Sequence, residues 1–223
     1  MNEIISNMKV MNLVTLINQA FRFVIQTSQE YNIDESHALK HSMEVFNYAN
    51  SIYENELLKN PALETDRKII YLSAIVHDMC DKKYMNEDSG IENMNKFMKD
   101  YIAPDELTMV SNIIKTMSYS KVKVNGYPNF GEHQQAYHII READLLAAYD
   151  LDRCIIYKMM RDRCNYTDAL LESKNLFEKR ILNYRKDNLF VTHYSKNKSL
   201  LLHKKALNDM EKLNALLRLL ESI

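Results

Sequence analysis

The feature that most restricts the fold of this 223-residue chain is its shortage of glycine and proline, of which it has only 3 each. An all-β sandwich needs these residues at its many tight turns. A glycine-rich dinucleotide-binding loop is disfavoured by the same count. Hydrophobic residues make up 46% of the chain, which is enough to build one sizeable core. We therefore predict an all-α protein that folds as a single helical domain over residues 1–223.

Charge and cysteine content narrow the class of protein further. The 29 basic and 30 acidic residues give a net charge of -1, which argues against a strongly basic nucleic-acid binder. Cys80, Cys154 and Cys164 are odd in number and lack a short paired spacing, so we expect core thiols in a reducing compartment. Residues 1–14 lack a basic segment and a cleavage site, and no apolar run approaches the roughly 18 residues of a membrane span. We expect a soluble, cytoplasmic protein.

Apolar residues recur at helical spacing along almost the whole chain. The segment from Lys68 to Asp78 is apolar nearly all round, which predicts a buried central helix. Residues 118–131 contain Asn125-Gly126, Pro128 and Gly131, so we predict an irregular loop there. We expect Thr65 to cap the central helix. A capping box at Ser89–Glu92 predicts the start of another helix, and Pro104 is expected in the first turn of the one after it. The remaining predicted helices cover about 13–31, a segment from near Ser36, one from about Glu132, 154–160, 169–182 and 200–220. The leucine stripe of the last helix, which includes Leu220, indicates a contact with the core or with another subunit. The sequence therefore leaves open whether the protein forms a homo-oligomer.

The pair His77-Asp78 is the most informative motif for function. This pair lies at the end of the apolar central helix. Burying an unpaired carboxylate there would cost roughly several kcal/mol of folding free energy unless a cation or hydrogen bonds compensate its charge. A divalent metal ion compensates both side chains at once. His41 on the second helix and Asp144 on the helix after the loop would complete such a site. Each of these residues has an ordinary alternative role, as a buried histidine or a solvated acid.

Two neutral imidazoles and two carboxylates balance the charge of one divalent cation. The remaining positions around the cation stay free for water and a phosphate oxygen. This mixed nitrogen and oxygen set suits Mn, Fe, Co, Zn or Mg and does not choose sharply among them.

In this order, His41, His77-Asp78 and Asp144 resemble the H…HD…D signature of the HD superfamily of metal-dependent phosphohydrolases. The segment HDMCDKKY, residues 77–84, is similar to the HD-x-x-D-x-K-[FY] form of a branch of small, single-domain members that includes bacterial nucleotide pyrophosphohydrolases. SYSK at residues 118–121 and the spacing of His37 and His41 fit the same branch. The resemblance implies an HD-type helical bundle, with a metal-site core over about 30–150 and helices from 152–223 packed on it.

The resemblance also implies a function and a set of site residues. The expected reaction is hydrolysis of a phosphate ester or phosphoanhydride of a nucleotide, with a nucleoside triphosphate cleaved to a monophosphate and pyrophosphate. One divalent ion is the expected cofactor, and Mn is the first candidate. Asp81 would orient or deprotonate water. The expected substrate-binding residues are Lys83, Lys82, His37, Ser118, Tyr119 and Ser120.

Three departures from the family pattern affect expected substrate contacts rather than the four metal ligands. Glu44 stands where the family usually has an arginine, Ala38 where it often has an acid, and residues 145–147 lack a further arginine and aspartate. Two alternatives therefore stay open. The chain could be a catalytically silent HD module that binds metal and a nucleotide or protein partner, or a helical interaction protein without a metal.

Overall fold

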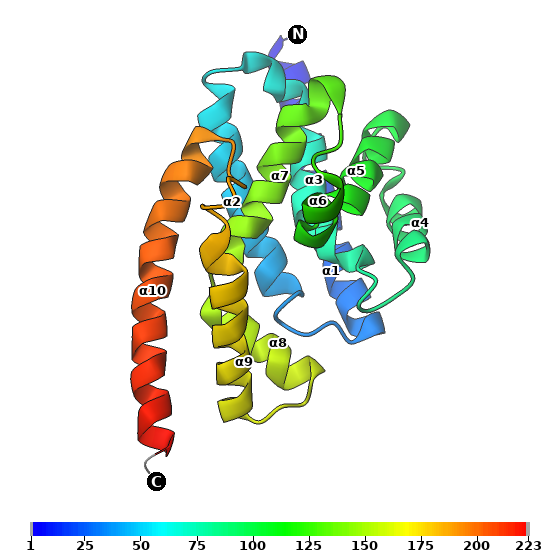
Figure 1. The fold of residues 1–223 in the computed structure, drawn as a ribbon. Coiled ribbons are helices and arrows are strands. Elements are labelled where there is room, and N and C mark those ends of the chain that lie inside the picture. The colour runs from blue at the N-terminus through cyan, green and yellow to red at the C-terminus, as the bar shows by residue number, and fades with distance from the viewer. Residues whose placement is uncertain (1, 222–223) are drawn as a thin grey trace.

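The computed structural model describes the backbone of residues 2–221 and the side chains of residues 13–219. This part of the chain is helical and contains no β-strand, so the predicted all-α fold is confirmed (Figure 1). The side chains of residues 1–12 and of Leu220 lie outside this description. The α-helices are α1 (Asn2–Tyr31), α2 (Leu39–Leu57), α3 (Arg67–Val76), α4 (Glu87–Met98), α5 (Pro104–Thr116), α6 (Tyr119–Asn125), α7 (Gln134–Ala147), α8 (Leu151–Arg161), α9 (Tyr166–Lys179) and α10 (His193–Glu221). Short 3₁₀ helices cover Pro61–Asp66, His77–Cys80, Gly131–His133 and Ile181–Asn183.

Helix α3 is the centre of the core, as its apolar sequence predicts. Every residue from Ile69 to Val76 is buried. The helix packs against α1, α2, α5 and α7, which surround it (Figure 1). Because water is excluded on all sides, a polar residue at the end of this helix must find its partners within the protein.

Helices α2 and α7 pack against each other as well as against α3. These three helices are therefore mutual neighbours in the core. Side chains on their facing surfaces can meet even though they lie far apart in the sequence.

The C-terminal helices cover one side of this core. Helices α8 and α9 form a packed pair, and α10 runs along α2, α7 and α9 (Figure 1). A fully buried carboxylate, Glu142 on α7, fixes the segment that leads into α10. It accepts hydrogen bonds from the backbone nitrogens of Val191 (2.5 Å) and Thr192 (3.2 Å) and from the Thr192 hydroxyl (2.6 Å).

Two predicted helix caps are displaced. Thr65 does not cap the central helix: its hydroxyl donates to the Ala62 carbonyl within the preceding 3₁₀ helix, and α3 begins at Arg67. The predicted capping box at Ser89–Glu92 is wrong as a helix start, because α4 already begins at Glu87. Its N-cap is Asn86, whose side chain accepts from the Ser89 backbone nitrogen at 3.0 Å. Asparagine caps a helix about as well as serine does.

The segment 118–131 is only partly irregular, so the prediction of a loop over its whole length is wrong. Residues Tyr119–Asn125 form α6, which buries Val122. The helix ends at Gly126, which has a φ of 72°, a conformation that suits glycine. All the turn signals therefore lie at or after the end of this helix. Pro104 does begin α5, as expected.

Within the described part of the chain, no helix has the length and apolar character needed to cross a bilayer. Cys80, Cys154 and Cys164 are free thiols, and none of them forms a disulfide.

Candidate metal centre

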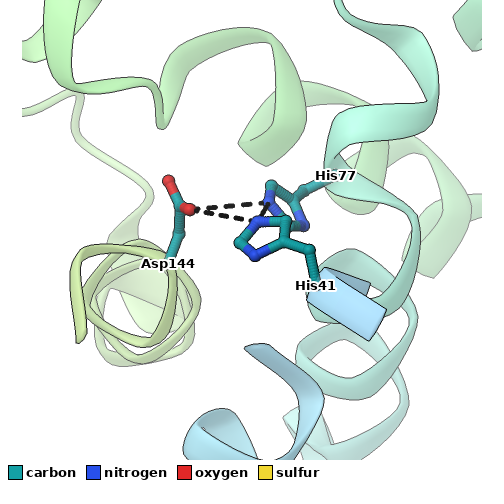
Figure 2. Close-up of side chains that lie close together, drawn as sticks. All are labelled: His41, His77 and Asp144. Atoms are coloured by element: carbon teal, nitrogen blue, oxygen red, sulfur yellow. Dashed lines mark hydrogen bonds and ion pairs between the residues drawn. The ribbon is translucent and has the colours of Figure 1, made fainter. Parts of the chain in front are cut away.

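Side chains from three helical segments converge at one end of the core. His41 projects from α2, and Asp144 projects from α7. His77 and Asp78 begin the 3₁₀ helix that directly follows α3. Figure 2 shows the two imidazoles side by side with the carboxylate of Asp144 pointing toward them.

The facing atoms lie at distances that suit ligands of a single cation. His41 Nε2 lies 3.2 Å from His77 Nε2, and Asp144 Oδ1 lies 3.5 Å from the first and 3.7 Å from the second (Figure 2). Asp78 Oδ2 lies 3.2 Å from His41 Nε2 and 3.4 Å from His77 Nε2. Neighbouring ligands about 2.1 Å from one ion stand about 3.0–3.5 Å apart in octahedral or tetrahedral geometry. His41, His77 and Asp144 form a group able to hold a metal ion.

The hydrogen bonds of the cluster also fit a cation. His77 Nδ1 lies 3.0 Å from the Ala74 carbonyl oxygen, to which it donates. In the neutral ring this leaves a lone pair on Nε2, the atom that faces His41. Asp78 Oδ2 is buried and accepts no hydrogen bond from the described residues. A buried carboxylate oxygen without a donor is a site that a metal ion would satisfy.

The electrostatics of the cluster are those of strongly coupled opposite charges. Burial lowers the pKa of His77, but Asp78 and Asp144 outweigh it and raise that pKa to about 10. Burial raises the pKa of Asp78, but the neighbouring histidines outweigh it and hold that pKa well below its usual value. Burial raises the pKa of Asp144, but the nearby His41 and His77 outweigh it and hold that pKa well below its usual value. Both carboxylates are therefore ionised and ready to bind a cation.

The cluster opens into a cavity of about 340 Å³. Asp78, Asp144 and His77 form part of its wall, and basic and aromatic side chains form much of the rest. His41, 1% exposed, lies behind this wall. A ligand in the cavity would thus meet the candidate metal centre on one side and positive charge on others.

Three of the predicted site residues form one contact network on the cavity wall. Lys83 Nζ lies 3.3 Å from Asp81 Oδ2 and 3.2 Å from His37 Nε2. Burial, with Arg153 and Lys83 nearby, lowers the pKa of His37 to about 2, so its ring is neutral and accepts from the lysine. His37 Nδ1 lies 2.6 Å from the Ser36 hydroxyl. In this structure His37 positions Lys83, and Lys83 neutralises Asp81.

The remaining predicted residues also line the cavity. They are Lys82, Ser118, Tyr119 and Ser120. The hydroxyls of Ser118 and Ser120 lie 3.4 Å apart near the start of α6. The ring of Tyr119 packs against Tyr184, with a centroid distance of 5.5 Å, and against a guanidinium.

Sequence reasoning missed several residues of the cavity wall. Arg153 on α8 is the nearest of them to the metal cluster, with Nη2 3.6 Å from Asp78 Oδ2 and Nη1 4.0 Å from Asp144 Oδ1. Lys121, Tyr157 and Arg180 line the same cavity. No short motif surrounds Arg153, Tyr157 or Arg180. Only the packing of α8 and α9 on the core brings these residues to the site.

Comparisons with known proteins do not assign the chain to a family: no family model, curated protein or solved structure matches it. The fold and the site therefore define it only as an all-α protein with a candidate centre of two histidines and two aspartates.

Proposed function

We propose that this protein is an HD-type, metal-dependent phosphohydrolase that acts on a nucleotide. The observation that supports the proposal most directly is the placement of His41, His77, Asp78 and Asp144 around one point at the wall of a basic cavity. Residues 77–84 and 118–121, which resemble segments of the HD superfamily, lie at the same cavity. The substrate we propose is a nucleoside triphosphate, cleaved to a monophosphate and pyrophosphate.

Each group of residues has a distinct role in this proposal. The two histidines and two aspartates would hold one divalent ion, with Mn as first candidate and Mg, Fe, Co and Zn as others. When bound, the ion would lower the pKa of a coordinated water and polarise a phosphoryl oxygen. Asp81 would accept a proton from the attacking water. Lys83 and Lys82 would balance phosphate charge, and hydroxyls at Ser118 and Ser120 would donate to phosphate oxygens.

The proposal is tested with purified protein loaded with Mn²⁺ and a panel of ribonucleotides and deoxyribonucleotides. We expect release of phosphate or pyrophosphate from at least one of them. Asp144→Asn should abolish that release, whereas Asp152→Asn, at an exposed position on α8, should leave it unchanged. Failure to cleave any nucleotide, while elemental analysis shows a bound metal ion, would count against the proposed reaction.

A second candidate function is a catalytically silent module that binds metal and a nucleotide. It is favoured by Arg153, whose guanidinium lies beside both Asp78 and Asp144 and can hold a nucleotide phosphate at the cluster without turnover. For such a module we expect a nucleotide to raise the melting temperature with no turnover, because a ligand that binds only the folded state stabilises it.

The compartment we propose is the cytoplasm. The supporting observation is that Cys80, Cys154 and Cys164 are free thiols, as in proteins from reducing compartments.

A further inference from the structure

The cationic side chains of the cavity differ in how they are neutralised. Lys83 lies 3.3 Å from Asp81, and Lys121 Nζ lies 2.6 Å from Glu87 Oε1. Both lysines thus already have a carboxylate partner. Arg180, at the end of α9, has none: within the described residues no carboxylate oxygen lies within 4.0 Å of its guanidinium. It is therefore a cation of the cavity wall that remains available to an anionic ligand.

The guanidinium of Arg180 is also held in place. Its Nε donates to the Tyr184 hydroxyl at 3.0 Å, and its Cζ lies 4.3 Å from the centroid of the Tyr119 ring. None of its terminal nitrogens makes a hydrogen bond to the part of the chain that is described. A stacked guanidinium loses little freedom on binding, and its free N–H groups match two oxygens of a phosphate.

Arg180 and Arg153 belong to different parts of the cavity. Arg153 lies next to the metal cluster and donates from Nε to the Ser36 carbonyl at 2.5 Å. Arg180 forms no ion pair or hydrogen bond with the four candidate metal ligands and lies against the rings of Tyr119 and Tyr184 instead. A phosphate beside the metal centre would meet Arg153, whereas Arg180 would meet a second anionic group.

We propose that Arg180 binds a second phosphate of the substrate and so makes the site selective for a phosphate chain over a single phosphate. Tyr119 and Tyr184 act as positioning residues, since they fix the guanidinium. The inference rests on the proposed function insofar as the first phosphate lies at the metal centre. It assigns to the C-terminal helices, rather than to the motif-bearing core, the recognition of substrate length.

The test compares two probes that cannot be hydrolysed, methylphosphonate and methylenediphosphonate, by calorimetry with Mn²⁺-loaded protein. Arg180→Gln should weaken binding of the diphosphonate by about tenfold, the effect of losing one charge-assisted contact, and leave binding of methylphosphonate unchanged. Arg22→Gln, at an exposed position on α1, is the matched control and should alter neither affinity. Chelation of free Mn²⁺ by the diphosphonate is the same for every variant, so only the difference between variants is scored.

A second variant guards against misfolding. Arg180→Lys keeps the charge but loses the planar fork, so we expect an intermediate loss for the diphosphonate. Equal affinity of wild type, Arg180→Gln and Arg180→Lys for the diphosphonate would overturn the inference, as would an equal loss for both probes. If the diphosphonate effect is found but no nucleotide is hydrolysed, the second-phosphate site stands and the proposed reaction fails. If nucleotides are hydrolysed and the effect is absent, only the inference fails.

Discussion

At the scale of single residues, the tautomer of His77 decides whether the cluster can bind a metal. Its Nδ1 donates to the Ala74 carbonyl, so Nε2 of the neutral ring carries the lone pair and points at His41. The backbone of α3 thus fixes the orientation of a ligand that the HD dipeptide only suggests. Asp78, the next residue, contributes a buried oxygen that accepts no hydrogen bond from the described residues.

We expect His77→Ala to lower the affinity for Mn²⁺ severely. Loss of an outer-sphere partner already costs about 10- to 100-fold in metal affinity, and loss of a ligand should cost more. Isothermal titration calorimetry, with elemental analysis of the dialysed protein, measures the change. His193→Ala, at an exposed histidine on α10, is the control and should bind as wild type does. Unchanged affinity in His77→Ala would show that the ion, if any, binds elsewhere.

His138 on α7 should make the free energy of unfolding depend on pH, independently of the metal centre. Burial, with a smaller effect of Arg141, lowers the pKa of His138 to about 4 from an ordinary value of 6.5. The unfolded chain therefore binds a proton between about pH 6.5 and pH 4 that the folded chain does not bind. The free energy of unfolding should fall as the pH falls through this interval.

The measurement is urea denaturation from about pH 7 to about pH 5, for wild type and His138→Gln. We expect the variant to lose less stability over this interval, because the other titrating groups are common to both proteins. His193→Gln should retain the steeper wild-type dependence. Parallel curves for wild type and His138→Gln would contradict the assignment.

At the scale of elements, hydrophobic periodicity predicts most of the helices but not where they start. The burial of α3 follows directly from its composition, because a helix that is apolar on every face has no side for solvent. The start of α4 does not follow, since Asn86 and Ser89 are both good caps and only the backbone path decides between them. Helix α6 was hidden because its few turns precede a cluster of turn residues, which dominate the local pattern.

Gly90 shows how closely α4 approaches the turn that carries the metal motif. A Cβ at this position would lie 2.8 Å from Met85 Sδ and 3.0 Å from the Cα of Cys80, the last residue of the 3₁₀ helix His77–Cys80. The methionine can move, but the backbone of Cys80 cannot move without shifting that turn. Alanine favours a helix over glycine by about 1 kcal/mol, whereas overpacking costs about 1–3 kcal/mol.

We therefore expect Gly90→Ala to be about 1 kcal/mol less stable than wild type in urea denaturation, although alanine has the higher helix propensity. Glu92→Ala, at an exposed position of the same helix, should change stability by less than about 0.5 kcal/mol. A Gly90→Ala protein as stable as wild type would show that the turn at Cys80 moves aside without cost.

At the scale of the whole molecule, the site is composite. The four candidate ligands lie within residues 41–144, and the residues that the motifs single out are ones that the structure brings together. Arg153 and Arg180 come from the helices that follow, and no motif marks them. Their positions depend on contacts between segments far apart in the chain, which local patterns do not encode. The charge of the cavity could therefore be predicted only in part.

A composite site held by three segments of the core predicts that a bound metal stabilises the whole fold. An ion that binds only the folded state adds about 2.7 kcal/mol at a concentration 100 times its dissociation constant. In a domain of this size that corresponds to a rise in melting temperature of about 5–10 °C. We expect this rise when Mn²⁺ is added to chelator-treated protein, monitored by circular dichroism.

Ca²⁺ should have little effect, because it prefers oxygen ligands and the centre offers two imidazole nitrogens. Asp144→Asn should respond to neither ion. An equal rise with Mn²⁺ and Ca²⁺, or a wild-type response in Asp144→Asn, would mean that the cluster is an ion-pair network of the core and that the cation binds the protein elsewhere.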